Sequence, residues 1–159
     1  MTSQQLRTAM EAWGPSVYRL ALCRLQNIQD AQDVYQDVFL RFFQQSADGW
    51  DGERTKAWLL RTAVNRCTDL SRFRLRRRTI PLESITDLAA PPEQAASELW
   101  EAVASLPPKF RTVVHLHYAE GYSTAEIARI LSIPDATVRT RLARAREKLK
   151  FALGGDEYE

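Results

Sequence analysis

The spacing of hydrophobic positions along the chain predicts helices almost throughout. Apolar residues recur about every 3.6 positions, and no long stretch alternates with period 2. The predicted helices cover approximately residues 4–24, 28–46, 56–76, 95–105, 109–120, 124–131 and 135–151. This pattern predicts an all-α fold class.

One segment interrupts the helical pattern and divides the chain. Residues 79–96, TIPLESITDLAAPPEQAA, contain prolines near both ends and show no helical face, so we interpret them as a flexible linker. The chain of 159 residues is long enough for two small domains. We therefore predict helical domains at 1–78 and 97–153, followed by an acidic tail at 154–159.

Charge is unevenly distributed, although the net charge is only +2. Residues 58–78 carry a net charge of +6, residues 79–108 carry −5, and residues 109–153 carry +5. Two basic blocks separated by an acidic spacer indicate two contacts with a polyanion.

Composition argues against a membrane protein and against a metal or cofactor site. No apolar run approaches the roughly 18 residues of a membrane span, and the N-terminus lacks a signal-peptide pattern, so we expect a cytoplasmic chain. Cys23 and Cys67 occupy apolar helical positions, which favours buried thiols over a redox pair. His115 and His117 have no acidic or cysteine partner nearby in the sequence, which disfavours a metal site.

The second basic block has the spacing of a helix-turn-helix. Ser123 or Thr124 can cap a short helix that has Glu126 in its first turn. Ala128 is small where two helices would cross, Ser132 occupies the turn, and Val138 returns to the core ten residues after Ala128. This arrangement is typical of helix-turn-helix DNA-binding motifs.

The second helix of this motif carries a face rich in arginine. We expect Asp135 to cap it, and the turn at Ser132 is of a kind that favours a glycine with positive φ. Arginines on a helix that fits the major groove can contact guanines or phosphates. The predicted duplex-binding residues are Thr137, Arg139, Thr140, Arg141 and Arg144.

The first basic block combines cations with aromatic rings. Its apolar arc consists of Leu59, Leu60, Ala63, Val64, Cys67 and Leu70. Rings, amides and cations on the opposite face are typical of surfaces that bind unpaired bases, although Trp58 and Phe73 could instead pack in the core. The predicted residues for this role are Trp58, Arg61, Asn65, Arg66, Asp69, Arg72 and Arg76.

The helix before it carries an acidic stripe that includes Asp30, Asp33 and Asp37. Three aspartates could suggest a metal-dependent nuclease, but no histidine or further acid from another motif converges on them. Like charges at these spacings slightly destabilise a lone helix, and a basic partner would relieve that. We therefore favour a protein-docking surface.

Three segments, in this order, closely resemble motifs of bacterial extracytoplasmic-function (ECF, group 4) RNA polymerase sigma factors. They are DAQDVYQDVFLRFF (30–43), WLLRTAVNRCTDLSR (58–72) and GYSTAEIARILSIPDATVRTRLARAR (121–146). The departures from the family pattern are Gln32 for the usual acid, Ser132 for the turn glycine, and Asp135 with Ala136.

The resemblance implies two DNA-binding domains and a polymerase partner. Region 2 would dock on the clamp helices of the largest subunit and open the −10 element, with Asn65 at the separated strand and the loop 46–56 capturing a flipped base. Region 4 would bind the −35 element and the polymerase flap. An anti-sigma factor would complete the partners, with no small-molecule substrate. The residues expected to contact polymerase are Asp30, Asp33, Gln36, Asp37, Leu40 and Arg41.

Two other functions compete with this interpretation. An ordinary helix-turn-helix regulator would use only residues 109–150 and would leave the acidic stripe and the aromatic, arginine-rich helix without a role. An enzyme would need a catalytic constellation, and the sequence offers only the three aspartates. The sigma-factor interpretation accounts for all three segments.

Overall fold

The structure is a computed structural model that describes residues 1–76 and 98–152. Every regular element within these residues is helical, which confirms the all-α prediction. The predicted linker and acidic tail lie outside the described residues, as does the side chain of Arg76. The chain divides into two compact units between residues 89 and 90, a position inside the predicted linker.

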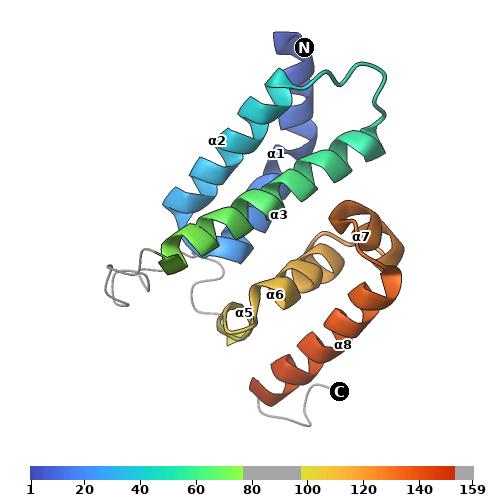
Figure 1. Ribbon diagram of the computed structural model, residues 1–159. Helices are drawn as coiled ribbons and strands as arrows, with labels where there is room; N and C mark the ends of the chain where they lie inside the picture. The colour runs from blue at the N-terminus through green and yellow to red at the C-terminus, as the bar shows by residue number, and fades with distance from the viewer. Residues whose placement is uncertain (77–97, 153–159) are drawn as a thin grey trace. The chain divides into compact units, whose positions relative to one another are not determined.

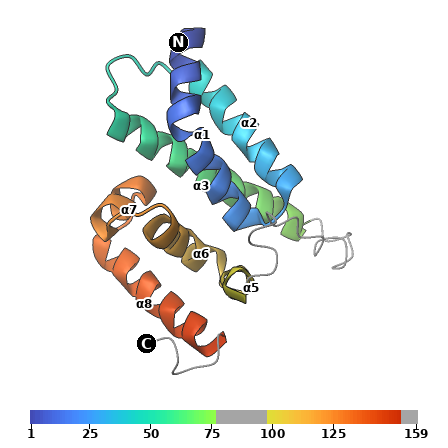
Figure 2. The same cartoon turned by 180° about the vertical axis from the view of Figure 1, so that it is seen from behind.

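The first unit is a bundle of three helices, α1 (Ser3–Leu25), α2 (Ile28–Gln44) and α3 (Gly52–Arg76), which pack against one another (Figures 1 and 2). A capping box between Thr2 and Gln5 begins α1. The backbone N–H groups of Thr2 and Gln5 are thereby satisfied by side chains of the same segment, which lets the helix start without a tertiary partner.

The core of this unit is formed by the predicted apolar arcs. Leu59, Leu60, Ala63 and Cys67 of α3 are buried, as is Cys23 of α1. Burial of both cysteines confirms their predicted place in the core. On α3, Val64 and Leu70 are only partly buried, so the buried arc is narrower than the hydrophobic pattern predicted.

The second unit contains α5 (Glu98–Ala104), α6 (Pro108–Val114), η1 (His115–Ala119), α7 (Thr124–Leu131) and α8 (Asp135–Ala152). Helix α8 packs on both α6 and α7 (Figure 1). The sequence predicted one α-helix over 109–120. Its last turn is instead the π-helix η1, an uncommon geometry that side-chain periodicity does not reveal.

The π-helical turn changes the surroundings of His115. His115 Nε2 lies 3.1 Å from Glu120 Oε2, and both side chains are largely buried. The expectation that no acidic partner lies near this histidine was therefore wrong, because a π-helix aligns residues five apart. His117 Nδ1 lies 2.8 Å from the carbonyl oxygen of Tyr122. Each histidine thus has a partner within the fold.

The helix-turn-helix begins and turns as its sequence predicted. Ser123 and Glu126 form the capping box of α7. Ser132 takes a left-handed conformation, with φ 56° and ψ 47°, so a serine occupies the conformation that usually favours glycine. The shared core of the motif consists of Ile127, Ile130, Val138, Leu142 and Ala145.

Candidate nucleic-acid and polymerase interface

A polar hollow of about 480 Å³ lies between α2 and α3 in the first unit. It brings together Trp58, Asn65, Arg66 and Asp69, four of the residues predicted to bind unpaired bases, with Arg41 from the acidic stripe. Asn65 and Asp69 are exposed, so the amide and carboxylate are accessible to a ligand. The remaining lining residues are Gln44, Gln45 and Thr62.

Trp58 belongs both to the core and to this hollow. Its ring centroid lies 5.7 Å from that of Phe42, which is buried, and 6.2 Å from that of Trp50. The aromatic cluster holds one side of the indole, while the ring also lines the hollow. A ring fixed in this way can stack on a base with little loss of conformational entropy. Phe73, by contrast, is 49% exposed and does not line the hollow.

Helix α3 starts four residues earlier than its hydrophobic pattern predicted. Asp51 Oδ1 accepts a hydrogen bond from the backbone N–H of Arg54 at 2.8 Å, the interaction of an N-cap. Residues 52–56, which the sequence placed in the base-capturing loop, are therefore helical. The loop between α2 and α3 is correspondingly shorter. It holds Trp50, whose ring lies 4.5 Å from the guanidinium carbon of Arg54.

Arg61 and Arg72, two further residues predicted to bind the −10 strand, do not line the hollow. Arg61 is partly buried and Arg72 is exposed, both on α3. Their charge lies on the same helix as Asn65, which suits contacts with a phosphate backbone leading to the hollow. Arg76 ends the described helix.

The acidic stripe presents most of its predicted residues to solvent. Asp33, Gln36 and Arg41 are exposed on α2, and Leu40 is 57% exposed. Phe43 of the same helix is also exposed, so α2 presents two large apolar side chains that a protein partner could cover. Asp37 is only partly exposed, because it also pairs with Arg66 of α3 at 2.6 Å.

Asp30 departs from the sequence expectation. Its side chain is 8% exposed, and Arg74 Nη2 lies 2.5 Å from its Oδ1. A buried carboxylate paired within the chain does not fit a direct contact with a docking partner. The hydrophobic pattern missed this because Arg74 lies 44 positions away, and only the packing of α2 on α3 brings the two together.

Burial raises the pKa of the Asp30 carboxyl, and Arg74 offsets this only in part. Because the folded-state pKa exceeds the unfolded one, the stability contributed by protonated Asp30 is fully present below the unfolded pKa. It is lost as pH rises through the folded pKa.

Asp30→Asn cannot ionise and should lack this pH-dependent contribution to stability. The parent should lose stability as pH rises from acidic to neutral, whereas Asp30→Asn should not. The free energy of unfolding of Asp30→Asn minus that of the parent should therefore increase over this pH range. Denaturant titrations at several pH values would measure it, and a constant difference would contradict it.

The predicted duplex-binding residues lie on one end of α8. Arg139, Thr140 and Arg144 are exposed, while Thr137 and Arg141 are partly exposed. The structure thus gathers them on the helix that follows the turn, the position of a recognition helix.

Asp135 contacts Arg139 rather than capping α8. The carboxylate Oδ2 pairs with Arg139 Nη1, and the backbone N–H of Val138 bonds to the carbonyl oxygen of Pro134. The predicted cap was therefore wrong: Asp135 lies one position inside the helix, where its side chain reaches the residue four ahead.

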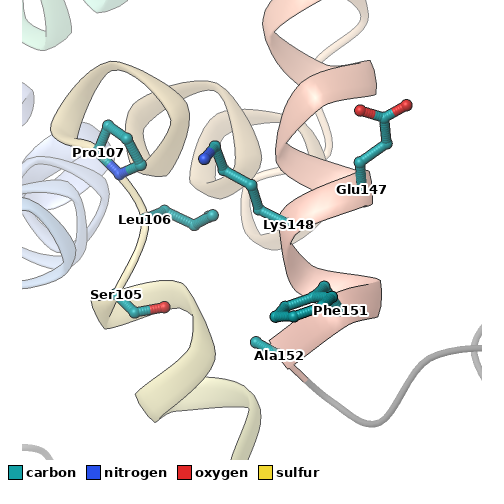
Figure 3. Close-up of a pocket in the computed structure, with 7 residues that line it drawn as sticks. All are labelled: Ser105, Leu106, Pro107, Glu147, Lys148, Phe151 and Ala152. Atoms are coloured by element: carbon teal, nitrogen blue, oxygen red, sulfur yellow. The ribbon is translucent and has the colours of Figure 1, made fainter.

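A second hollow, of about 510 Å³, lies between the α5–α6 turn and the end of α8. Phe151 and Lys148 extend from α8 toward it, and Glu147 of the same helix also lines it (Figure 3). Phe151 is 88% exposed, so its aromatic ring is accessible to a binding partner. The other lining residues are Ser105, Leu106, Pro107 and Ala152.

Sequence reasoning missed two arginines with partners inside the fold. Arg24 is buried in the first unit, where its Nη2 donates to Thr68 Oγ1 at 3.1 Å, and burial lowers its pKa. Arg146 Nε donates to Tyr118 Oη at 2.6 Å. Arg24 lies in the largely aliphatic end of α1, and Arg146 lies in the arginine-rich helix α8. The spacing of polar and apolar residues does not distinguish either arginine from its neighbours.

Within the described residues, no group of three histidine, cysteine or acidic side chains is placed to hold a metal ion. None of the helices in the same residues is long and apolar enough to cross a membrane.

Comparisons with known proteins match both units. Residues 9–79 match the family Sigma-70 region 2, and residues 96–149 match Sigma-70, region 4. The ECF RNA polymerase sigma factor SigW of Bacillus subtilis is 29% identical over 166 residues, covering 91% of this chain and 86% of that protein. The ECF RNA polymerase sigma factor SigM of Mycobacterium tuberculosis is 33% identical over 140 residues, covering 87% of this chain and 71% of that protein.

Two solved structures have a similar fold. CnrH, in complex with the cytosolic domain of CnrY, aligns with a TM-score of 0.70 at 27% identity, covering 96% of this chain and 89% of that one. The sigma factor RpoE from Bartonella quintana, in complex with the anti-sigma factor NepR, aligns with a TM-score of 0.75 at 22% identity, covering 97% of this chain and 99% of that one. The paired region 2 and region 4 matches, together with 33% identity to SigM, show that this protein belongs to the ECF RNA polymerase sigma factors.

Proposed function

We propose that this chain is a group 4 sigma factor that directs core RNA polymerase to its promoters from the cytoplasm, by binding rather than by catalysis. The observation that carries the proposal is the hollow in the first unit, where a fixed tryptophan, an exposed asparagine and an arginine meet. An indole supplies a stacking surface, an amide can hydrogen-bond a base edge, and a guanidinium can hold a phosphate.

In this proposal the two units perform two binding tasks. The α3 face of the first unit, with the hollow and the arginines Arg61, Arg72 and Arg76 of the same helix, holds the separated −10 strand. Helix α8 of the second unit binds the −35 duplex in the major groove. Binding unpaired bases traps the open promoter and offsets the few kcal/mol that unstacking costs.

Polymerase docking is assigned to two surfaces. The exposed residues of α2, Asp33, Gln36, Leu40 and Arg41, with Asp37 at their edge, would meet the basic side of the clamp helices. The hollow beside Phe151 would receive the polymerase flap. Asp30 is left out of the docking surface and given a structural role, because its carboxylate is buried against Arg74.

Regulation by an anti-sigma factor is also part of the proposal. Support comes from CnrH, which was solved with the cytosolic domain of CnrY, and from the apolar side chains that α2 exposes. Leu40 and Phe43 would suit a protein partner that competes with polymerase for the same face.

Run-off transcription with core polymerase tests the function as a whole. The purified chain should allow core enzyme to initiate at discrete sites on a genomic DNA library. Failure to bind core polymerase in a pull-down would overturn the proposal and favour an ordinary helix-turn-helix regulator. Cleavage of DNA that requires magnesium and is abolished by Asp37→Asn would instead favour an enzyme.

Replacing Asn65 with alanine should slow promoter opening about tenfold, the effect of one lost hydrogen bond in a partly dry site. The side chain is exposed, so the fold should be unaffected and polymerase binding should be unchanged. Permanganate reactivity of unpaired thymines, followed over time, measures the opening. Gln4→Ala, an exposed amide on α1, is the matched control. Equal loss of polymerase binding and opening would show that Asn65 is structural.

A further inference from the structure

We propose that Asp135 is a specificity-determining residue of region 4, because it aims Arg139 at a guanine of the −35 duplex and away from the phosphate backbone. The inference rests on the proposed function, in which α8 lies in the major groove. Asp135 is an acid in the first turn of that helix. The need to bind a polyanion does not explain an acid at this position.

Asp135 and Arg139 form an ion pair within the first turns of α8. Asp135 Oδ2 pairs with Arg139 Nη1, four positions later on the same helix. The other carboxylate oxygen, Oδ1, is buried and has no hydrogen-bond partner among the described residues. The backbone N–H groups of Thr137 and Val138 donate to the carbonyl oxygen of Pro134. The carboxylate is therefore directed to Arg139 and not to the start of the helix.

The ion pair leaves one edge of the Arg139 guanidinium available. Nη1 is engaged by Asp135, whereas Nε and Nη2 have no partner within residues 1–76 and 98–152. These two nitrogens lie side by side and form a fork that fits the O6 and N7 acceptors of guanine. The Arg139 side chain is 63% exposed, so the fork is accessible to a base. Arg139 can thus pair with Asp135 and with a guanine at once.

Asp135 also disfavours the alternative contact of Arg139 with a phosphate. The start of a helix attracts phosphates through its N–H groups and its dipole, and an acid in the first turn offsets that attraction. The carboxylate also restricts the rotamers of Arg139, which lowers the entropy lost when the guanidinium binds a base. Phosphates are the same at every base pair. Asp135 therefore lowers the affinity for all duplexes and raises the discrimination between them.

The test uses the full chain and short duplexes from a promoter that run-off transcription identifies. One duplex carries the natural −35 sequence, and each of the others has one base pair replaced. In the parent, replacing the G·C pair bound by Arg139 should weaken binding about five- to 150-fold, the value of a bidentate arginine–guanine contact. Asp135→Asn should reduce this ratio at least about threefold, because Arg139 is no longer held in the orientation that fits the base.

The salt dependence of binding gives a second readout, which a purely structural role of Asp135 would not change in this direction. In Asp135→Asn, Arg139 is free to contact a phosphate. The slope of log affinity against log salt concentration should therefore become steeper by roughly one. The affinity for the altered duplexes should rise about threefold at low salt, because an acid has been removed from the phosphate-facing end of the helix.

Two further variants serve as controls. Arg139→Gln should abolish discrimination at the same G·C pair, and Asp135→Asn added to it should cause no further loss of discrimination. Glu101→Gln removes the same charge from an exposed position on α5 of the same unit, and it should leave both discrimination and salt slope unchanged. Backbone NMR signals of region 4 should show that each variant is folded, because none of the three side chains belongs to the core.

The possible outcomes separate this inference from the proposed function. Full discrimination in Asp135→Asn, or an equal change in Glu101→Gln, would overturn the role of Asp135. If no G·C pair lost discrimination in Arg139→Gln, the base contact would be wrong and the role of Asp135 would fall with it. A parent that binds every duplex alike would instead contradict the −35 role of region 4, and with it the proposed function.

Discussion

An Ile127→Ala variant should lose most of the stability of region 4 while region 2 remains folded. Ile127 is fully buried at the centre of the helix-turn-helix, and truncating such an isoleucine to alanine costs about 2–5 kcal/mol. A unit of about 55 residues has only roughly 3–8 kcal/mol of stability in total. The deletion should therefore unfold a large fraction of region 4, and with it −35 recognition.

Thermal unfolding of the full chain, followed through backbone NMR signals assigned to each region, would measure this effect. Ile127→Val is the matched control, because it removes one methylene and should cost about 0.5–1.5 kcal/mol. Polymerase binding through α2 should persist in both variants. Parallel loss of region 2 signals would show instead that the two regions unfold as one cooperative unit.

An Arg141→Ala variant should bind −35 duplex DNA more weakly by about 1–3 kcal/mol, the value of a side chain that contacts a base edge in the major groove. Arg141 is partly exposed on α8 beside Thr140. Its truncation removes no core atom, so region 4 should keep its stability. Fluorescence anisotropy measures the loss of affinity, with one short duplex that carries the −35 sequence and one in which that sequence is altered.

The sequence dependence of that loss identifies the contact. A base contact predicts that Arg141→Ala discriminates less between matched and altered duplexes, whereas a phosphate contact predicts equal weakening on both and a reduced salt dependence. Lys148→Ala is the control, since Lys148 is an exposed cation farther along the same helix. If Lys148→Ala weakened binding as much as Arg141→Ala, the recognition role of Arg141 would not hold.

Local sequence was sufficient for the features that depend on neighbours within one helix. Of the two predicted cap candidates, Ser123 and Thr124, it is Ser123 that forms the capping box with Glu126, because these partners lie three residues apart and the backbone alone brings them together. The left-handed turn at Ser132 followed from the spacing of the helix-turn-helix, even without the usual glycine. Helix bounds agreed within a few residues, except at Asp51, where the N-cap begins α3 earlier than the apolar pattern.

Local sequence was insufficient where a side chain has more than one accessible partner. It placed Asp30 on the docking stripe, although α3 supplies Arg74 and buries the carboxylate. It placed Asp135 as a cap, although the carboxylate lies closer to Arg139. In each case the partner of the carboxylate depended on neighbouring groups that helical periodicity does not describe.

The sequence by itself determined the helices, the two-part organisation of charge and the resemblance to sigma factors, because these depend on periodicity and on motifs within single segments. Only the tertiary structure decided that Trp58 serves the core and the hollow together, and that Asp37 joins the docking helix to Arg66. The reason is physical. Ion pairs and ring contacts act over a few ångströms, and it is the packing of α2 on α3 that brings residues 29 positions apart within that range.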